Sequence, residues 1–109
     1  MLIRDVVPVR SPKVIKGMTE QRQKWAREGV DIEVRPVETG PFSMEFATEE
    51  VLAGPHVLKA VIEAERDGAD AVVLDCMVDP VLRAARECVS IPVLAPGLAG
   101  LGVSAMLGA

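Results

Sequence analysis

Short apolar stretches alternate with segments of helical periodicity along this chain, and this alternation constrains the fold more than any other feature. Strands are predicted at residues 2–9, 30–37, 71–75 and 91–96, and the third of these (AVVLD) is a nearly continuous apolar run, typical of a central parallel strand. Helices are predicted at residues 12–28, 55–66, 79–89 and from 97 onward, with Gly29 and Gly68 as stop signals. Right-handed crossovers between such strands give an α/β fold, an open, doubly wound, four-stranded parallel sheet with helices on both faces.

The length of 109 residues fits a single domain of this flavodoxin-like type, spanning residues 1–109 without a linker. Two Phe, one Trp and no Tyr leave Val, Leu, Ile, Ala and Met to build the core. The net charge is −4 and no Lys/Arg cluster is present, so a nucleic-acid partner is not expected. Arg4 and Asp5 interrupt any apolar leader, and we predict a cytoplasmic protein.

The uncharged segment from residue 88 onward could be mistaken for a membrane span. Pro92, Pro96 and several glycines interrupt it, so we predict a strand, a turn and a buried helix instead, with no membrane partner.

The alternating segment 30–37 contains Pro36 and predicts an edge strand. Residues 38–50 have no sustained period, and a loop of this length in a small domain is often functional. In the first helix, the inner stripe is predicted to comprise Val14, Ile15, Met18 and Trp25.

Cys76 follows the central strand directly, and ligands of open parallel sheets bind where the chain leaves such strands. Asp79 is expected to cap the third helix, with Pro80 in its first position. The helix start favours a thiolate at Cys76, whereas Asp75 and Asp79 disfavour it, and the net effect stays open. A small buried hydrophobe and a functional thiol are equally compatible with this cysteine. Cys88 lies on the inner stripe of the third helix and is interpreted as core filling.

Other chemically capable side chains fit structural roles at least as well. The two cysteines lack the spacing of a zinc site or of a disulfide framework, so neither a metal nor another cofactor is expected. Met44 and Met77 are compatible with an apolar pocket beside the thiol or with simple packing. His56 is interpreted as a surface residue. Three acidic residues are interpreted as charges at a helix start, namely Glu45, Glu49 and Glu50.

The segments GPFSMEFATEEVLAGPHVLKAVIEAERDGADA and GADAVVLDCMVDPVLRAARECVSIPVLAPG resemble the N-terminal half of the aspartate/glutamate racemase superfamily, in particular its hydantoin racemase branch. The resemblance runs from about residue 40 to residue 97. It implies an isomerase without a cofactor that racemises or epimerises a carbon next to a carbonyl or carboxylate, with Cys76 as one of two proton-transferring cysteines. The positions matching the family's substrate-binding loops are Arg10, Ser11, Ser43 and the backbone at Met77 and Val78.

Members of that superfamily are about twice as long and carry the second cysteine on a second lobe. The resemblance therefore implies a small-molecule substrate together with a homodimer partner or a second lobe. The uncharged tail also favours a partner, because a helix that is apolar on most sides needs extensive burial. Two further hypotheses remain open, namely a non-catalytic domain that binds a small carboxylate or imide, and an isolated lobe without activity.

Overall fold

The computed structural model describes residues 1–108 and contains a four-stranded, all-parallel sheet with four helices. The sheet order is β2-β1-β3-β4, which confirms the predicted open, doubly wound α/β fold with β2 at an edge. The elements in chain order are β1 (Leu2–Val7), α1 (Pro12–Trp25), β2 (Asp31–Pro36), α2 (Ala47–Arg66), β3 (Ala71–Leu74), α3 (Leu82–Cys88), β4 (Val93–Leu94) and α4 (Pro96–Met106).

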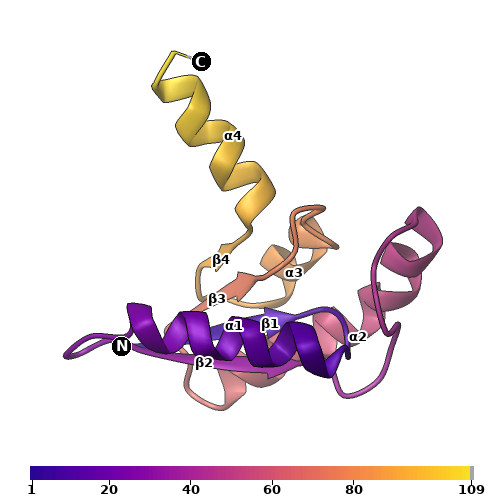
Figure 1. The fold of residues 1–109 in the computed structure, drawn as a ribbon, viewed down its shortest axis with the longest axis horizontal. Coiled ribbons are helices and arrows are strands. Elements are labelled where there is room, and N and C mark those ends of the chain that lie inside the picture. Colours follow the sequence, from indigo (N-terminus) through magenta and orange to yellow (C-terminus); the bar gives the residue numbers. More distant parts are fainter. Residues whose placement is uncertain (109) are drawn as a thin grey trace.

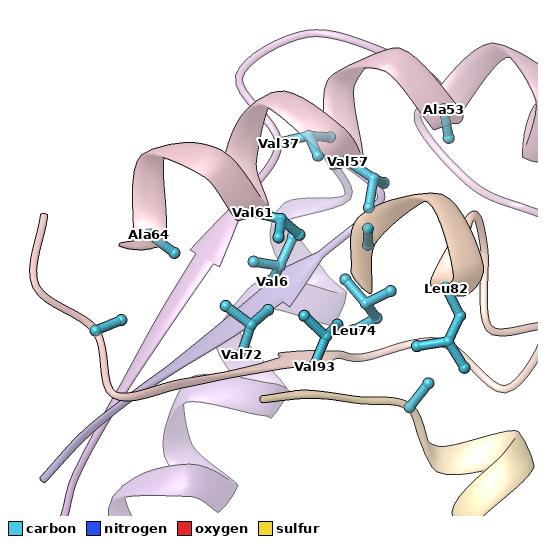
Figure 2. Close-up of a cluster of buried hydrophobic side chains, with 13 residues drawn as sticks. Val6, Val37, Ala53, Val57, Val61, Ala64, Val72, Leu74, Leu82 and Val93 are labelled. Carbon is cyan, nitrogen blue, oxygen red and sulfur yellow. The ribbon is translucent and has the colours of Figure 1, made fainter. Parts of the chain in front are cut away.

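The hydrophobic core lies between the sheet and the helices α2 and α3, as Figure 2 shows. Alternate residues of the central strands point into it, among them Val6, Val72 and Leu74, each fully buried. They meet the inner stripe of α2, where Val57 and Val61 are also fully buried. Every second residue of the strands and one face of the helix are thus buried, as the apolar periodicity of the sequence predicts.

Helix α1 covers the opposite face over β1 and β2 (Figure 1). None of its residues is fully buried, and the predicted inner stripe is wrong at Val14 and Trp25, which are 39% and 57% exposed. The indole instead packs under the Arg22 guanidinium, whose central carbon lies 4.5 Å from the ring centroid. On the same sheet face, Leu94 of β4 is 51% exposed, so the half of this face over β3 and β4 is poorly covered.

Helix α2 begins at Ala47, eight residues before the predicted start at Pro55. Glu49 explains the earlier start, since its carboxylate accepts the backbone N–H of Phe46 at 3.0 Å and so satisfies a donor at the helix end. Pro55 is accommodated inside the helix at a solvent-exposed position. The predicted loop 38–50 is therefore shorter, and Glu49 is a helix-start charge as expected.

Helix α3 begins at Leu82 and not at Asp79, so the predicted cap at Asp79 is wrong. The shorter helix buries Leu82 and Ala85, and its stripe leads on to the half-buried Val89. Cys88 is exposed, and its interpretation as core filling is therefore also wrong.

Helix α4 projects away from the rest of the domain (Figure 1). None of its residues is buried, which corrects the prediction of a buried helix, and Leu101 is 72% exposed. Within residues 1–108, no helix combines the length and hydrophobicity needed to cross a bilayer.

Candidate active site

A cavity of about 430 Å³ opens at the carboxyl ends of β1 and β3. The chain leaves these two adjacent strands toward opposite sides of the sheet, and such a switch point is where open α/β sheets bind ligands. The volume is in the range of small-molecule sites. The wall comes from the loops after β1, β2 and β3 and from the first half of α1, with Pro8, Val9, Ser11, Val14, Met18, Phe42, Ser43, Met44, Glu45, Asp75, Cys76 and Met77 as lining residues.

Cys76 is half-buried in this wall, two residues beyond the end of β3. The Asp75 N–H donates to Val6 O at 2.9 Å, which extends the pairing of β3 with β1 up to the cysteine. The Cys76 N–H then turns back to Leu74 O at 2.9 Å. The Cys76 Sγ lies 3.8 Å from the Met44 Sδ, so the thiol rests against a thioether from the loop after β2. Strand pairing and this sulfur contact place the thiol at the cavity wall.

The structure brings three of the predicted substrate-binding residues together with Cys76, namely Ser11, Ser43 and Met77. Ser11 stands at the N-cap position of α1, followed by Pro12 as predicted, yet its side chain makes no capping hydrogen bond. Its hydroxyl therefore has no role at the helix start.

The other two predicted residues, Arg10 and Val78, are not among those that line the cavity. The Arg10 Nε donates to the Gly40 carbonyl at 2.9 Å and so ties the loop after β1 to the loop after β2. Val78 is 53% exposed, beyond the cavity wall. Arg10 thus helps to hold two loops that form the wall.

A buried ionic cluster of Asp5, Arg22 and Asp75 lies next to the cavity. The Arg22 Nε donates to the Asp5 Oδ2 at 2.6 Å, and its Nη2 reaches the Asp75 Oδ2. Asp5 is 1% exposed, and its Oδ1 has no hydrogen-bond partner within the described residues. Burial, reinforced by the neighbouring Asp75 charge and opposed by Arg22, raises the pKa of Asp5 to about 6. The same Arg22 guanidinium thus contacts the carboxylates of both Asp5 and Asp75.

Sequence reasoning missed several residues of this region. Val14 and Met18 line the cavity although their helical stripe predicted packing against the sheet, and Phe42 joins them from the loop after β2. Asp5 carried a usable signal, because a carboxylate inside an apolar strand requires a partner. Its partner Arg22 is separated by 17 residues and is recognisable only once α1 is folded against β1.

A second, polar hollow of about 230 Å³ lies between α2 and β2. Its charged groups largely pair with one another, for example Lys59 Nζ with Glu38 Oε2 at 2.7 Å. His56 Nδ1 lies 2.8 Å from Thr39 Oγ1, so the histidine belongs to this hollow and not to the Cys76 cavity. Among residues 1–108, no group of three His, Cys, Asp or Glu side chains is arranged to hold a metal ion.

Comparison with known proteins places these observations in one family. Residues 11–109 match Asp/Glu/Hydantoin racemase, and the chain belongs to this family. A hydantoin racemase from Pseudomonas sp. (strain NS671) is 31% identical over 109 residues, which cover 100% of this chain and 44% of that protein. A hydantoin racemase from Paenarthrobacter aurescens is 29% identical over 110 residues, covering 100% of this chain and 47% of that protein.

Solved structures agree with this assignment. The allantoin racemase from Klebsiella pneumoniae superposes with a TM-score of 0.88 at 26% identity, over 97% of this chain and 43% of that one. The allantoin racemase from Pseudomonas fluorescens shares the fold, with a TM-score of 0.78 over 87% of this chain. The chain spans less than half the length of the relatives that it matches. The resemblance to the N-terminal part of this superfamily is thus confirmed.

Proposed function

We propose that this chain forms one lobe of a cofactor-independent racemase or epimerase in which the Cys76 thiol transfers a proton at a carbon next to a carbonyl or carboxylate. The observation that carries the proposal is the half-buried thiol in the wall of the cavity at the β1/β3 switch point, on a chain of the racemase family. The acidic groups in the same wall are less suited to this role. Asp75 is held by Arg22, and Glu45 is exposed to solvent.

The substrate class is a hydantoin-type ring or a related amino-acid derivative with an apolar substituent. The names of the relatives support the hydantoin class. The apolar part of the wall, which includes Val14, Met18 and Phe42, suits an apolar substituent. The hydroxyls of Ser11 and Ser43 in the same wall offer hydrogen bonds to carbonyl or imide groups.

The proton transfer requires two groups on opposite faces of the reacting carbon. The Cys76 thiolate takes the proton, the C–H electron pair delocalises into the adjacent carbonyl as an enolate, and the sulfur becomes a neutral thiol. A second acid then donates a proton to the other face, which inverts the centre and leaves that acid deprotonated. Within the described residues, the other cysteine, Cys88, is exposed and does not line the cavity.

The second acid comes from a second lobe, supplied by a homodimer partner or by further chain. The exposed apolar side chains of α4 support such a protein partner, since Leu101, Val103 and Met106 are 72%, 56% and 87% exposed. The apolar groups at the cavity itself support it too, because Phe42 and Met77 line the cavity and are still 61% and 71% exposed.

The test follows exchange and inversion separately on enantiopure 5-alkyl hydantoins in deuterium oxide. Proton NMR measures loss of the C5–H signal, and chiral chromatography measures inversion. A two-lobed assembly is expected to show both. A single lobe exchanges without inversion, because one thiol returns a deuteron to the face from which it took the proton.

The matched variants are Cys76→Ser and Cys88→Ser, since Cys88 is a free thiol on the same chain outside the cavity. We expect Cys76→Ser to lose catalysed exchange and Cys88→Ser to retain it. Equal rates in the two variants would contradict the proposal. Saturable ligand binding that survives Cys76→Ala, with no exchange in the unaltered chain, would instead establish a non-catalytic binding domain.

A further inference from the structure

The loop that carries Cys76, residues 76–81, is joined to the start of α4. The Asp79 carboxylate accepts two backbone N–H groups there, from Gly97 to Oδ1 at 2.8 Å and from Leu98 to Oδ2 at 2.6 Å. Both carboxylate oxygens thus cap α4, although Asp79 precedes α3 in sequence. An acidic side chain at this end of a helix satisfies free N–H donors and interacts favourably with the helix dipole.

The same residue is tied to the cysteine through the backbone. The Asp79 N–H donates to the Cys76 carbonyl at 3.0 Å, and the Asp79 carbonyl accepts the Leu82 N–H at 3.3 Å. Asp79 and Val81 both have positive φ, 50° and 51°. Asp tolerates this conformation, whereas a β-branched residue such as Val81 adopts it only when its surroundings enforce it. The capping bonds to α4 are a constraint of that kind.

Gly97 shows how closely the two segments meet. A Cβ placed at this residue would lie 2.5 Å from the Met77 carbonyl oxygen and 2.8 and 2.9 Å from the two Asp79 carboxylate oxygens. A side chain would therefore force α4 and the Cys76 loop apart. In contrast, a Cβ at Gly100, about one turn further along α4, would meet no atom within 4 Å apart from the backbone of its own helix and its chain neighbours.

We propose that Asp79 and Gly97 are positioning residues for Cys76, which hold the thiol in the cavity wall by locking its loop to the first turn of α4. The loop and the helix then move as one unit, so that a partner which reorients α4 also moves the thiol. The functional consequence rests on the role of Cys76 proposed above, whereas the positioning itself is measurable on the thiol without any substrate.

The experiment measures the rate of Cys76 alkylation by iodoacetamide in native buffer, in a Cys88→Ser background that removes the exposed thiol. Gly97→Ala and Asp79→Ala are each expected to change the rate by about five-fold or more, the size of effect that corresponds to the loss of one helix cap. Gly100→Ala is the matched control in the same helix, and its rate is expected to stay within about two-fold.

A second control separates positioning from a general loss of stability. The Glu65 carboxylate accepts the Ser90 N–H at 2.7 Å and the Ile91 N–H at 3.3 Å, so it tethers a different loop with the same chemistry. Glu65→Ala is expected to lower the melting temperature and leave alkylation unchanged. Asp79→Asn keeps one acceptor oxygen and should restore part of the rate that Asp79→Ala alters.

The proposal is overturned if Gly97→Ala leaves the alkylation rate of Cys76 unchanged, or if Glu65→Ala changes it as much. If Asp79→Ala does not fold, the comparison of Gly97→Ala with Gly100→Ala decides alone. A failed exchange assay with altered alkylation in Gly97→Ala would reject the racemase function and retain the positioning role.

Discussion

Replacement of Asp5 by Asn is expected to stabilise the protein at pH 7.5. Asp5 and Asp75 share one guanidinium, that of Arg22, so the ionised cluster holds two negative charges against one positive charge, and the Asp5 carboxylate is buried. Taking an incompletely paired charge out of water is costly. This is the physical reason why the pKa of Asp5 rises from 3.8 to about 6.

The sign of the effect follows from proton linkage. Between pH 4 and 6 the folded protein keeps the Asp5 proton while the unfolded chain has lost it, so the free energy of unfolding falls as the pH rises. One pKa unit corresponds to about 1.4 kcal/mol, so the penalty reaches on the order of 2–3 kcal/mol above pH 6. Asp5→Asn keeps an oxygen for Arg22 and removes the charge. Because its new N–H donors also need an acceptor, the expected gain at pH 7.5 is smaller, about 1–2 kcal/mol.

Urea unfolding followed by circular dichroism at pH 4, 5.5 and 7.5 measures this difference. At pH 4, where Asp5 is protonated in the folded protein, the variant should be less stable than the parent by about 1 kcal/mol, because only the cost of its unpaired N–H donors remains. As the pH rises, the order should reverse. Asp70→Asn is the control, because its exposed carboxylate accepts the Leu2 N–H at 2.6 Å and carries no burial penalty. A parent more stable than Asp5→Asn at pH 7.5 would refute the reasoning, since the ion pair with Arg22 would then outweigh the cost of burial.

Two further predictions concern packing and backbone strain. Leu74→Ala removes a fully buried side chain from the core and should lower the free energy of unfolding in urea by about 2–5 kcal/mol. Leu101→Ala, at an exposed position of α4, should change the free energy of unfolding of the chain alone by less than about 0.5 kcal/mol. Equal losses of stability in the two variants would show that α4 is covered in solution. Gly40→Ala should lower the free energy of unfolding by on the order of 1–3 kcal/mol, because Gly40 has a φ of +124° and a Cβ there would lie 3.1 Å from the His56 ring. A melting temperature equal to that of the parent would contradict this prediction.

The fold was predictable because its signals are local. The apolar run at residues 71–74 and the glycine stop at Gly68 are each readable within a few residues, and right-handed crossovers then limit the topology. Gly29 is not the predicted helix stop, because α1 already ends at Trp25 and Gly29 lies in the turn before β2. The same local logic placed Cys76 at the end of a central strand. The family resemblance assigned Ser11 and Ser43 to its surroundings, and both line the cavity at the strand ends.

The predicted starts of α2 and α3 were wrong because a residue that is favoured at a helix start can also occupy another position. Contacts with residues distant in sequence determine which position it takes. Asp79 followed by Pro80 is a good start for a helix at that point, yet the carboxylate binds the N–H groups of Gly97 and Leu98 and caps α4 instead. Pro55 also suggests a helix start, but Glu49 provides a capping hydrogen bond earlier in the chain. In both cases the deciding hydrogen bond, and not the residue preference, sets the boundary.

The cap on α4 connects two features of this chain, the thiol of Cys76 on an open cavity and an apolar helix that is exposed to solvent. If the positioning role holds, a partner that covers α4 acts on Cys76 through Asp79, and no direct contact with the thiol is needed. A second lobe that supplies the opposing acid would then also set the geometry of the first. Exchange without inversion by a single lobe should accordingly be slow even though the thiol is present, and it should accelerate when α4 is covered. A single lobe that exchanged protons at the rate of a two-lobed assembly would show that the thiol is already in its final position without a partner.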